Sequence, residues 1–182
     1  LAYQIIWIRK FGLVFGVTAY ATSAVLAAFF AGLALGSWLA GRRLLRLKIN
    51  PLLVYVCLET GIGMYALAVP FFLDSLYGVY GLLTPYLDFS FIALSLMRFF
   101  FSTLVLIIPT TFMGATLPLV SDALSSRIKN VTVNVSGLYA VNTFGALTGA
   151  AFSGFYSIGT FGMTETTWIA VASNLLAASL AF

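Results

Sequence analysis

The sequence predicts an all-α protein, a polytopic bundle of transmembrane helices. Hydrophobic residues make up 62% of the 182 residues and charged residues only 8%, whereas a soluble domain carries about 25% charged residues. A helix of about 20 residues crosses the hydrocarbon core of a bilayer. Apolar stretches of about that length recur along the chain. We therefore expect lipid to surround most of the protein, and residues 1–182 to form a single transmembrane domain.

Five full spans are predicted, in chain order 17–41, 52–73, 91–118, 136–157 and 166–182. The first carries no charged residue and ends directly before a cluster of arginines. Residues 1–7 are predicted to be the tail of a truncated first helix, and residues 8–16 a connector that leads into the first full span. We expect both ends of the chain to be cut.

Positive charges predict how the bundle is oriented. Four of the nine Lys and Arg residues follow the first span: Arg42, Arg43, Arg46 and Lys48. Because Lys and Arg accumulate in cytoplasmic loops, we expect residues 42–50 and 122–134 in the cytoplasm. Residues 74–90 carry two acids and no cation, which suits the outer side. Arg9 and Lys10 are exceptions, since they fall on that outer side.

Small residues spaced by four predict close contacts between helices. Gly32 and Gly36 are followed by Ser37 and Gly41 in the first span, and Gly145 and Gly149 repeat the spacing in the fourth. This spacing places small side chains on one helix face, where a neighbouring backbone can approach. Ordinary helix packing is the favoured interpretation, and a moving interface such as a transporter uses is the alternative.

Polar residues inside the spans predict an intramembrane network. Glu59 and Arg98 are each roughly 11 Å from opposite ends of adjacent antiparallel helices, so their side chains are expected to meet. Asn142 and Asn174 lie at comparable depths and extend the network. Three interpretations stay open: a structural ion pair, a pathway for a cation or substrate, and side chains that snorkel to the headgroups without meeting.

Five ordered stretches resemble a known family. The strongest are "PTTFMGATLP" at 109–118 and "LYAVNTFGA" at 138–146, and the remainder lie in residues 2–16, 24–46 and 51–67. Together they resemble the membrane part of bacterial fused proteins that join a major-facilitator-like helical domain to a spermidine synthase domain. The resemblance implies one six-helix half of a major-facilitator-like fold in the bacterial inner membrane. Many relatives carry Glu where this chain has Gln4, a further member of the candidate network.

The resemblance and the residues together limit the expected function. The chain has no His, which removes imidazole ligation, and no catalytic constellation, metal site or cofactor is expected. One hypothesis is a membrane domain of a protein of polyamine-type chemistry. Such a domain binds or transports a polyamine or another cation, or anchors the enzyme in the membrane. The alternative is a non-catalytic accessory subunit of a larger membrane complex. Expected partners are the lipid bilayer, other membrane subunits or an unseen remainder of the polypeptide, and no nucleic acid.

Overall fold

The computed structural model describes residues 1–44, 49–83, 91–125 and 131–181. The elements in chain order are α1 (Ala2–Phe15), α2 (Ala19–Arg42), α3 (Pro51–Leu83), α4 (Phe91–Ser125), α5 (Val131–Ala151), the π-helix η3 (Phe152–Ser157), α6 (Ile158–Phe161) and α7 (Met163–Ala181). No strand occurs within those described ranges, and the predicted all-α class is confirmed.

Three helices are long and apolar enough to cross a membrane. They cover Ala19–Arg42, Pro51–Val79 and Phe91–Leu124 and coincide with the first three predicted spans. The shortest has 24 residues, or roughly 36 Å at 1.5 Å per residue, which exceeds a hydrocarbon core of about 30 Å. The last two predicted spans are helical in α5 with η3 and in α7, but their crossing of a bilayer stays a prediction.

Local sequence signals explain where α2 and α3 begin. The hydroxyl of Thr18 accepts a hydrogen bond of 3.1 Å from the amide of Ala21, and so caps the first turn of α2. The side chain of Asn50 accepts a hydrogen bond of 3.0 Å from the amide of Leu52, and Pro51 occupies the first helical position, where its missing N–H costs nothing.

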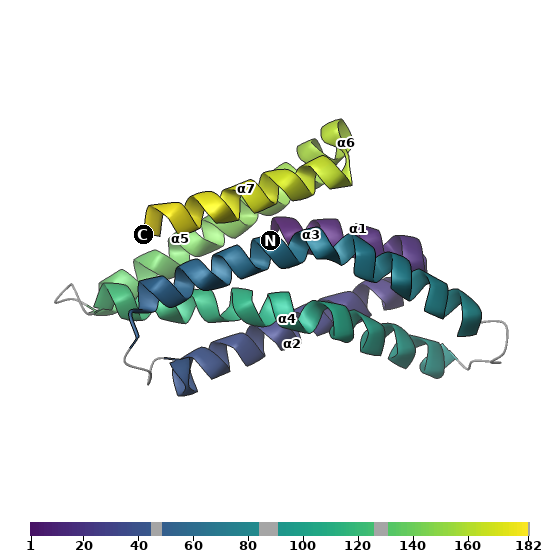
Figure 1. Ribbon diagram of the computed structural model, residues 1–182, viewed down its shortest axis with the longest axis horizontal. Helices are drawn as coiled ribbons and strands as arrows, with labels where there is room; N and C mark the ends of the chain where they lie inside the picture. Colours follow the sequence, from purple (N-terminus) through teal and green to yellow (C-terminus); the bar gives the residue numbers. More distant parts are fainter. Residues whose placement is uncertain (45–48, 84–90, 126–130, 182) are drawn as a thin grey trace.

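The helices form an elongated bundle with two distinct ends (Figure 1). The Arg42 end, as we name it, holds the C-termini of α2, α4 and α7, and the Lys10 end holds the C-termini of α1 and α3. α2 and α4 are parallel neighbours: Tyr20 meets Phe91 near their starts, with ring centroids 4.4 Å apart, and Ser37 reaches Gly114 farther along. The segments before the two basic loops therefore finish at the same end.

The predicted connector at residues 8–16 is wrong, because α1 continues through it to Phe15. Trp7, Phe11 and Phe15 recur every four residues and are at most 3% exposed, so one buried stripe continues past the charges at positions 9 and 10. The helix ends at Gly16, whose φ of 83° lies in the left-handed region that favours glycine.

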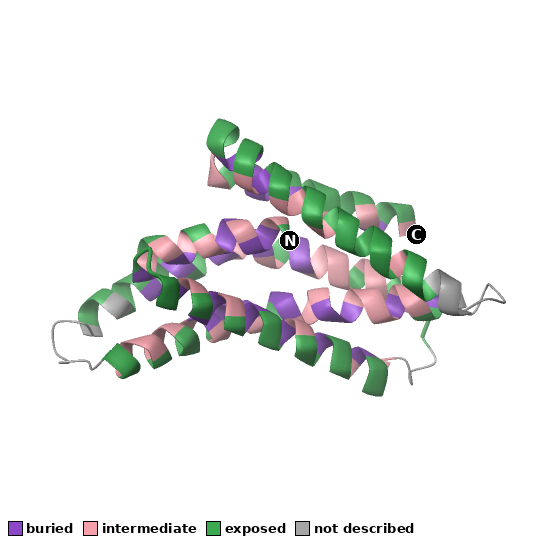
Figure 2. Cartoon of the chain, turned by 180° about the vertical axis from the view of Figure 1, so that it is seen from behind, coloured by how far each residue is buried: buried purple, intermediate pink, exposed green. Residues whose placement is uncertain are grey.

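The buried core is formed by α1 to α4 with a contribution from α7, and α5 stands apart from it. Figure 2 shows the buried residues along α1 to α4, whereas much of the α5 to α7 hairpin is exposed. None of the described side chains of α5, which are those of residues 135–151, is buried. A hydrogen bond of 2.9 Å between the hydroxyls of Ser157 and Thr166 joins η3 to α7.

The contact between α2 and α4 is the closest in the bundle, and glycines permit it. A Cβ on Gly32 would overlap the side chain of Thr110, one on Gly36 the backbone of Thr111, and one on Gly114 the backbone of Leu33. The structure therefore places Gly32 and Gly36 in a close-packed face of the kind that small residues at spacing four provide.

The other glycines proposed for packing do not perform that role. Gly41 and Gly145 have open space where a Cβ would stand, and the nearest atom to such a Cβ on Gly149 is the Ala2 nitrogen at 3.9 Å. The prediction is wrong for these three positions. Spacing alone identifies a face of small residues, but a close contact also requires a helix opposite that face, and α5 has little packed against it.

Two prolines inside α4 free backbone carbonyls that neighbouring helices then bond. Pro109 has no N–H for the carbonyl of Val105, one turn earlier, and the hydroxyl of Tyr65 from α3 donates to that carbonyl at 2.8 Å. Pro118 leaves the carbonyl of Gly114 free in the same way, and the hydroxyl of Ser37 from α2 donates to it at 2.8 Å. These bonds matter because an unsatisfied backbone group in hydrocarbon costs several kcal/mol.

We predict that Gly36→Ala lowers the free energy of unfolding by about 1–3 kcal/mol, because its Cβ meets the backbone of α4 and forces the helices apart. Denaturation in mixed detergent micelles measures the change. The matched control is Gly145→Ala, which has open space and gains up to about 1 kcal/mol of helix propensity. Equal stability of the two variants would contradict the packing described.

We also predict that Tyr65→Phe and Ser37→Ala each cost about 0.6–1.7 kcal/mol, the range for hydrogen bonds between membrane helices. Each removes the donor to a carbonyl that a proline has freed. The same denaturation assay applies. Tyr139→Phe and Ser95→Ala serve as controls, since Tyr139 is exposed and Ser95 bonds a carbonyl of its own helix. Losses as large in the controls would show that the two bonds have no special importance.

Candidate functional site

Glu59 is the centre of the best-developed polar site in the described structure. It lies half-buried on α3, and Tyr55 lies one turn earlier on the same helix. The amide of Asn174 on α7 donates to the backbone carbonyl of Glu59 at 3.4 Å. Tyr3 on α1 lies within the electrostatic influence of the same carboxylate. We call these four residues, which come from three helices, the Glu59 cluster.

The hydroxyl of Tyr3 is buried and has no hydrogen-bond partner among the described residues. A buried donor without a partner costs about 1–3 kcal/mol. Tyr3 stacks against Trp7 with ring centroids 5.4 Å apart, so its ring is held firmly in the core. The cluster therefore offers one half-buried carboxylate and one buried hydroxyl on a ring that packing holds in place.

A cleft of about 330 Å³ adjoins the cluster, and Tyr3 and Asn174 line it. Its other walls are the first turn of α1, the second half of α5 with η3, and one face of α7. Gly145 and Gly149 line this cleft, which accounts for the absence of a helix against them. Apolar walls with a few convergent polar groups are typical of small-molecule sites.

Arg98 does not meet Glu59. α3 and α4 are antiparallel, and the bond between Tyr65 and Val105 fixes their register. From that level Glu59 lies toward the Arg42 end and Arg98 toward the Lys10 end, so the two are separated by about thirteen residues, or roughly 20 Å. The predicted pairing is wrong because the predicted span ended at residue 73, whereas α3 continues to Leu83.

Within the described part of the chain, Arg98 has no hydrogen-bond or ion-pair partner. Its Nε is buried and makes no hydrogen bond, and the hydroxyl of Ser102, one turn later on α4, is in the same state. Side chains on a helix tilt toward its N-terminus, which for α4 is the nearby Lys10 end. Arg98 comes seven residues after Phe91, roughly 10 Å from the helix start, so this geometry favours the snorkelling interpretation.

The two remaining members of the predicted network differ in exposure. Asn142 is exposed on α5 and takes no part in the Glu59 cluster. Gln4 is 9% exposed on α1, beside Tyr3 in the chain. The structure therefore brings Glu59 and Asn174 together and leaves Arg98 and Asn142 outside.

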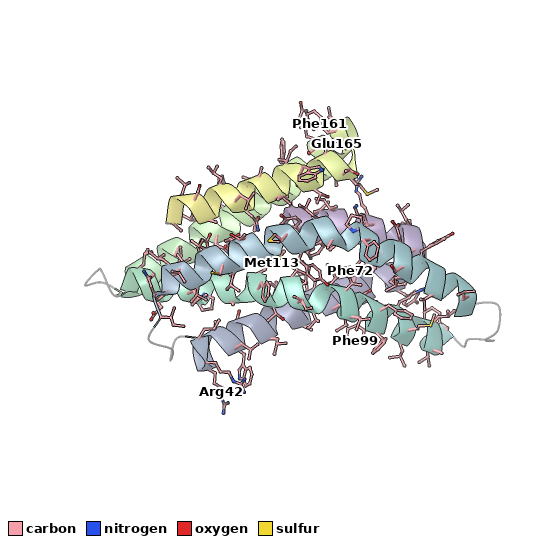
Figure 3. The ribbon with its side chains drawn as sticks, viewed as in Figure 1. Arg42, Phe72, Phe99, Met113, Phe161 and Glu165 are labelled. Carbon is pink, nitrogen blue, oxygen red and sulfur yellow. The ribbon has the colours of Figure 1, made fainter. Side chains whose placement is uncertain are left out.

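The basic residues at the Arg42 end are described in part. Arg42 stands over the ring of Trp38, with its guanidinium carbon 5.4 Å from the ring centroid, and it points away from the bundle (Figure 3). Arg43 is exposed. Arg46 and Lys48 lie outside the described residues, as do residues 126–130 of the second basic loop.

Three polar contacts of the structure have no counterpart in the sequence-based predictions. The guanidinium of Arg9 on α1 donates to the carbonyl of Gly154 in η3 at 3.2 Å, where the i→i+5 pattern of a π-helix departs from the usual backbone ladder. Tyr65 and Ser37 were also missed. Pro109 and Pro118 signal that two carbonyls need donors, but identifying the donors requires the register between helices.

Fold and site together define an all-helical protein with three helices long and apolar enough to cross a bilayer, and with the Glu59 cluster, which holds one carboxylate, between α1, α3 and α7. Within the described part of the chain, no group of three potential metal-binding side chains occurs. Comparison of the chain with protein-family models, with curated proteins and with solved structures gives no significant match.

We predict that Arg98→Met leaves the free energy of unfolding unchanged or raises it by up to about 2 kcal/mol, because an unpaired charge is costly in a membrane helix and no partner is lost. In a double-mutant cycle with Glu59→Gln, the coupling energy should stay below about 0.5 kcal/mol, as for distant sites. A coupling energy above about 1 kcal/mol would show that the two side chains interact.

Proposed function

We propose that the chain is a membrane-embedded helical domain that binds a polyamine-type cation at the Glu59 cluster and is not catalytic by itself. One observation carries this proposal: the half-buried carboxylate of Glu59 lies within a candidate span, and no cationic side chain bonds it within the described part of the chain. Tyr55 lies one turn away, and Asn174 bonds the backbone carbonyl of Glu59. A carboxylate at that depth is stabilised by a bound cation, since placing an isolated charge there costs at least about 2.5 kcal/mol of insertion free energy.

The neighbouring cleft suits a flexible chain that carries several ammonium groups. Protonated amines donate hydrogen bonds, and the cluster supplies acceptors in the carboxylate of Glu59 and the oxygen of Tyr3. The methylene groups between the amines would contact the apolar walls formed by Ile169 and Ala170. The site thus combines a charge that attracts an amine with a surface that accommodates its hydrocarbon.

The resemblance to the major-facilitator-like part of spermidine-synthase fusions supports the same ligand class. In this proposal the protein is one six-helix half with five full spans, in a bacterial inner membrane. The Arg42 end then faces the cytoplasm, because both basic loops leave the bundle from helix ends on that side.

A second candidate function is a non-catalytic accessory subunit of a larger membrane complex. The exposure of α5 favours it, since no described side chain of that helix is buried and large aromatic residues stand free, among them Tyr139 and Phe144. Aromatic residues are enriched at the cores of protein interfaces. A ligand at Glu59 is not needed for such a subunit, so ligand binding distinguishes the two candidates.

We predict that the purified protein binds spermidine and that Glu59→Gln weakens this binding at least tenfold, equivalent to about 1.4 kcal/mol. Scintillation-proximity or calorimetric titration in detergent measures the affinity. Glu165→Gln is the control, because it removes the same charge from an exposed position at the start of α7 (Figure 3). Equal binding by wild type and Glu59→Gln, or no binding by folded wild type, would contradict a ligand at the cluster.

We predict for the orientation that a cysteine at position 82 reacts with a membrane-impermeant reagent in intact cells, and that one at position 44 does not. The background is Cys57→Ser, which removes the native thiol. Permeabilised cells should label both positions, which controls for accessibility. Labelling of position 44 alone in intact cells would show that the protein has the opposite orientation.

A further inference from the structure

A second polar pocket lies at the Lys10 end and has no part in the proposed cation site. It has a volume of about 250 Å³ between α1, α3 and the start of α7. Lys10, Asp74, Tyr77 and Thr164 give it polar edges, and Pro70 and Leu73 form an apolar floor. Leu73 is buried, whereas Asp74, Tyr77 and Thr164 are exposed, so the pocket opens outward.

Two opposite charges border this pocket without bonding each other. Lys10 is half-buried on α1, and Asp74 on α3 attracts it electrostatically but makes no hydrogen bond with it. Neither residue has an ion-pair partner within the described part of the chain. A ligand with a negative and a positive group could therefore bond both side chains at once.

The position of the pocket along the bilayer normal indicates which ligand can bind in it. α3 has 33 residues, or roughly 50 Å, and therefore exceeds a bilayer of about 40–45 Å with both headgroup layers included. Lys10 lies about five residues before the end of α1 at Phe15, and Asp74 about nine residues before the end of α3 at Leu83, or roughly 7 Å and 13 Å. Both side chains are thus near the boundary between the headgroups and a hydrocarbon core of about 30 Å, and Tyr77 suits the aromatic belt found there.

We propose that this pocket holds the headgroup of phosphatidylethanolamine, with the phosphate at Lys10 and the primary ammonium at Asp74. The ammonium donates hydrogen bonds that the carboxylate accepts, and such charge-assisted bonds are the strong ones. Phosphatidylcholine has no N–H to donate, and phosphatidylglycerol brings no positive group to Asp74. Both lipids should therefore bind less well.

The test is a lipid competition on the whole chain, read by native mass spectrometry after the protein is released from nanodiscs of equal phosphatidylethanolamine, phosphatidylglycerol and phosphatidylcholine. We expect at least threefold more retained phosphatidylethanolamine than either competitor. Asp74→Asn should reduce the preference over phosphatidylglycerol to near one, and Lys10→Gln should reduce retention of all three lipids. Glu165→Gln, a loss of charge at the same end, should keep the wild-type pattern.

Three results would overturn the proposal. The first is wild-type protein that retains the three lipids equally, which needs no variant and so does not depend on the variants folding. The second is folded Asp74→Asn protein, verified by gel filtration, that keeps the wild-type preference. The third is a change in Glu165→Gln as large as that in Asp74→Asn, which would assign the effect to net charge and not to the pocket.

Discussion

Two carbonyls in the middle of α4 have no backbone partner, and the arrangement of the bundle depends on how they are satisfied. Lipid offers no hydrogen bond, so a helix that contains Pro109 and Pro118 must obtain donors from its neighbours. Tyr65 supplies one from α3 and Ser37 supplies the other from α2. Each bond joins a specific turn of α4 to a specific turn of another helix. The prolines that weaken α4 as an isolated helix therefore fix its register on both sides.

The hydrogen bond from Ser37 to Gly114 depends on the glycines between α2 and α4. A serine side chain is short, so the hydroxyl of Ser37 reaches the carbonyl of Gly114 only where the two backbones are close. Gly36 and Gly114 allow that approach, because a Cβ at either position would overlap the backbone of the facing helix. The close approach of the α2 and α4 backbones thus provides both dispersion contacts and one hydrogen bond, as is common where small residues line membrane helices.

Composition and periodicity were sufficient for the coarse fold and insufficient for the site. The all-α class and the first three spans follow from long apolar runs, and Gly32 with Gly36 follows from spacing. Helix ends were the weak point: Arg9 and Lys10 suggested a loop where the stripe of Trp7 and Phe11 continues a helix. The same error at the end of α3 produced the false pairing of Glu59 with Arg98. Tyr3 joins Glu59 in the structure only because α1 and α3 converge, which no local pattern encodes. Tyr55 precedes Glu59 by four residues on α3, a spacing that does make two side chains neighbours on a helix.

The parallel contact of α2 with α4 has a consequence for the order of assembly. α3 lies between them in the chain, so the small-residue face of α2 enters the membrane well before the helix that covers it. Until α4 has been synthesised, Gly32, Gly36 and the hydroxyl of Ser37 have no partner from α4. A nascent chain that stops after α3 is held mainly by the contacts that α1 makes with α2 and with α3. Partly synthesised membrane proteins with such open faces are prone to incorrect association. Completion of α4 is therefore the step that commits the chain to this bundle.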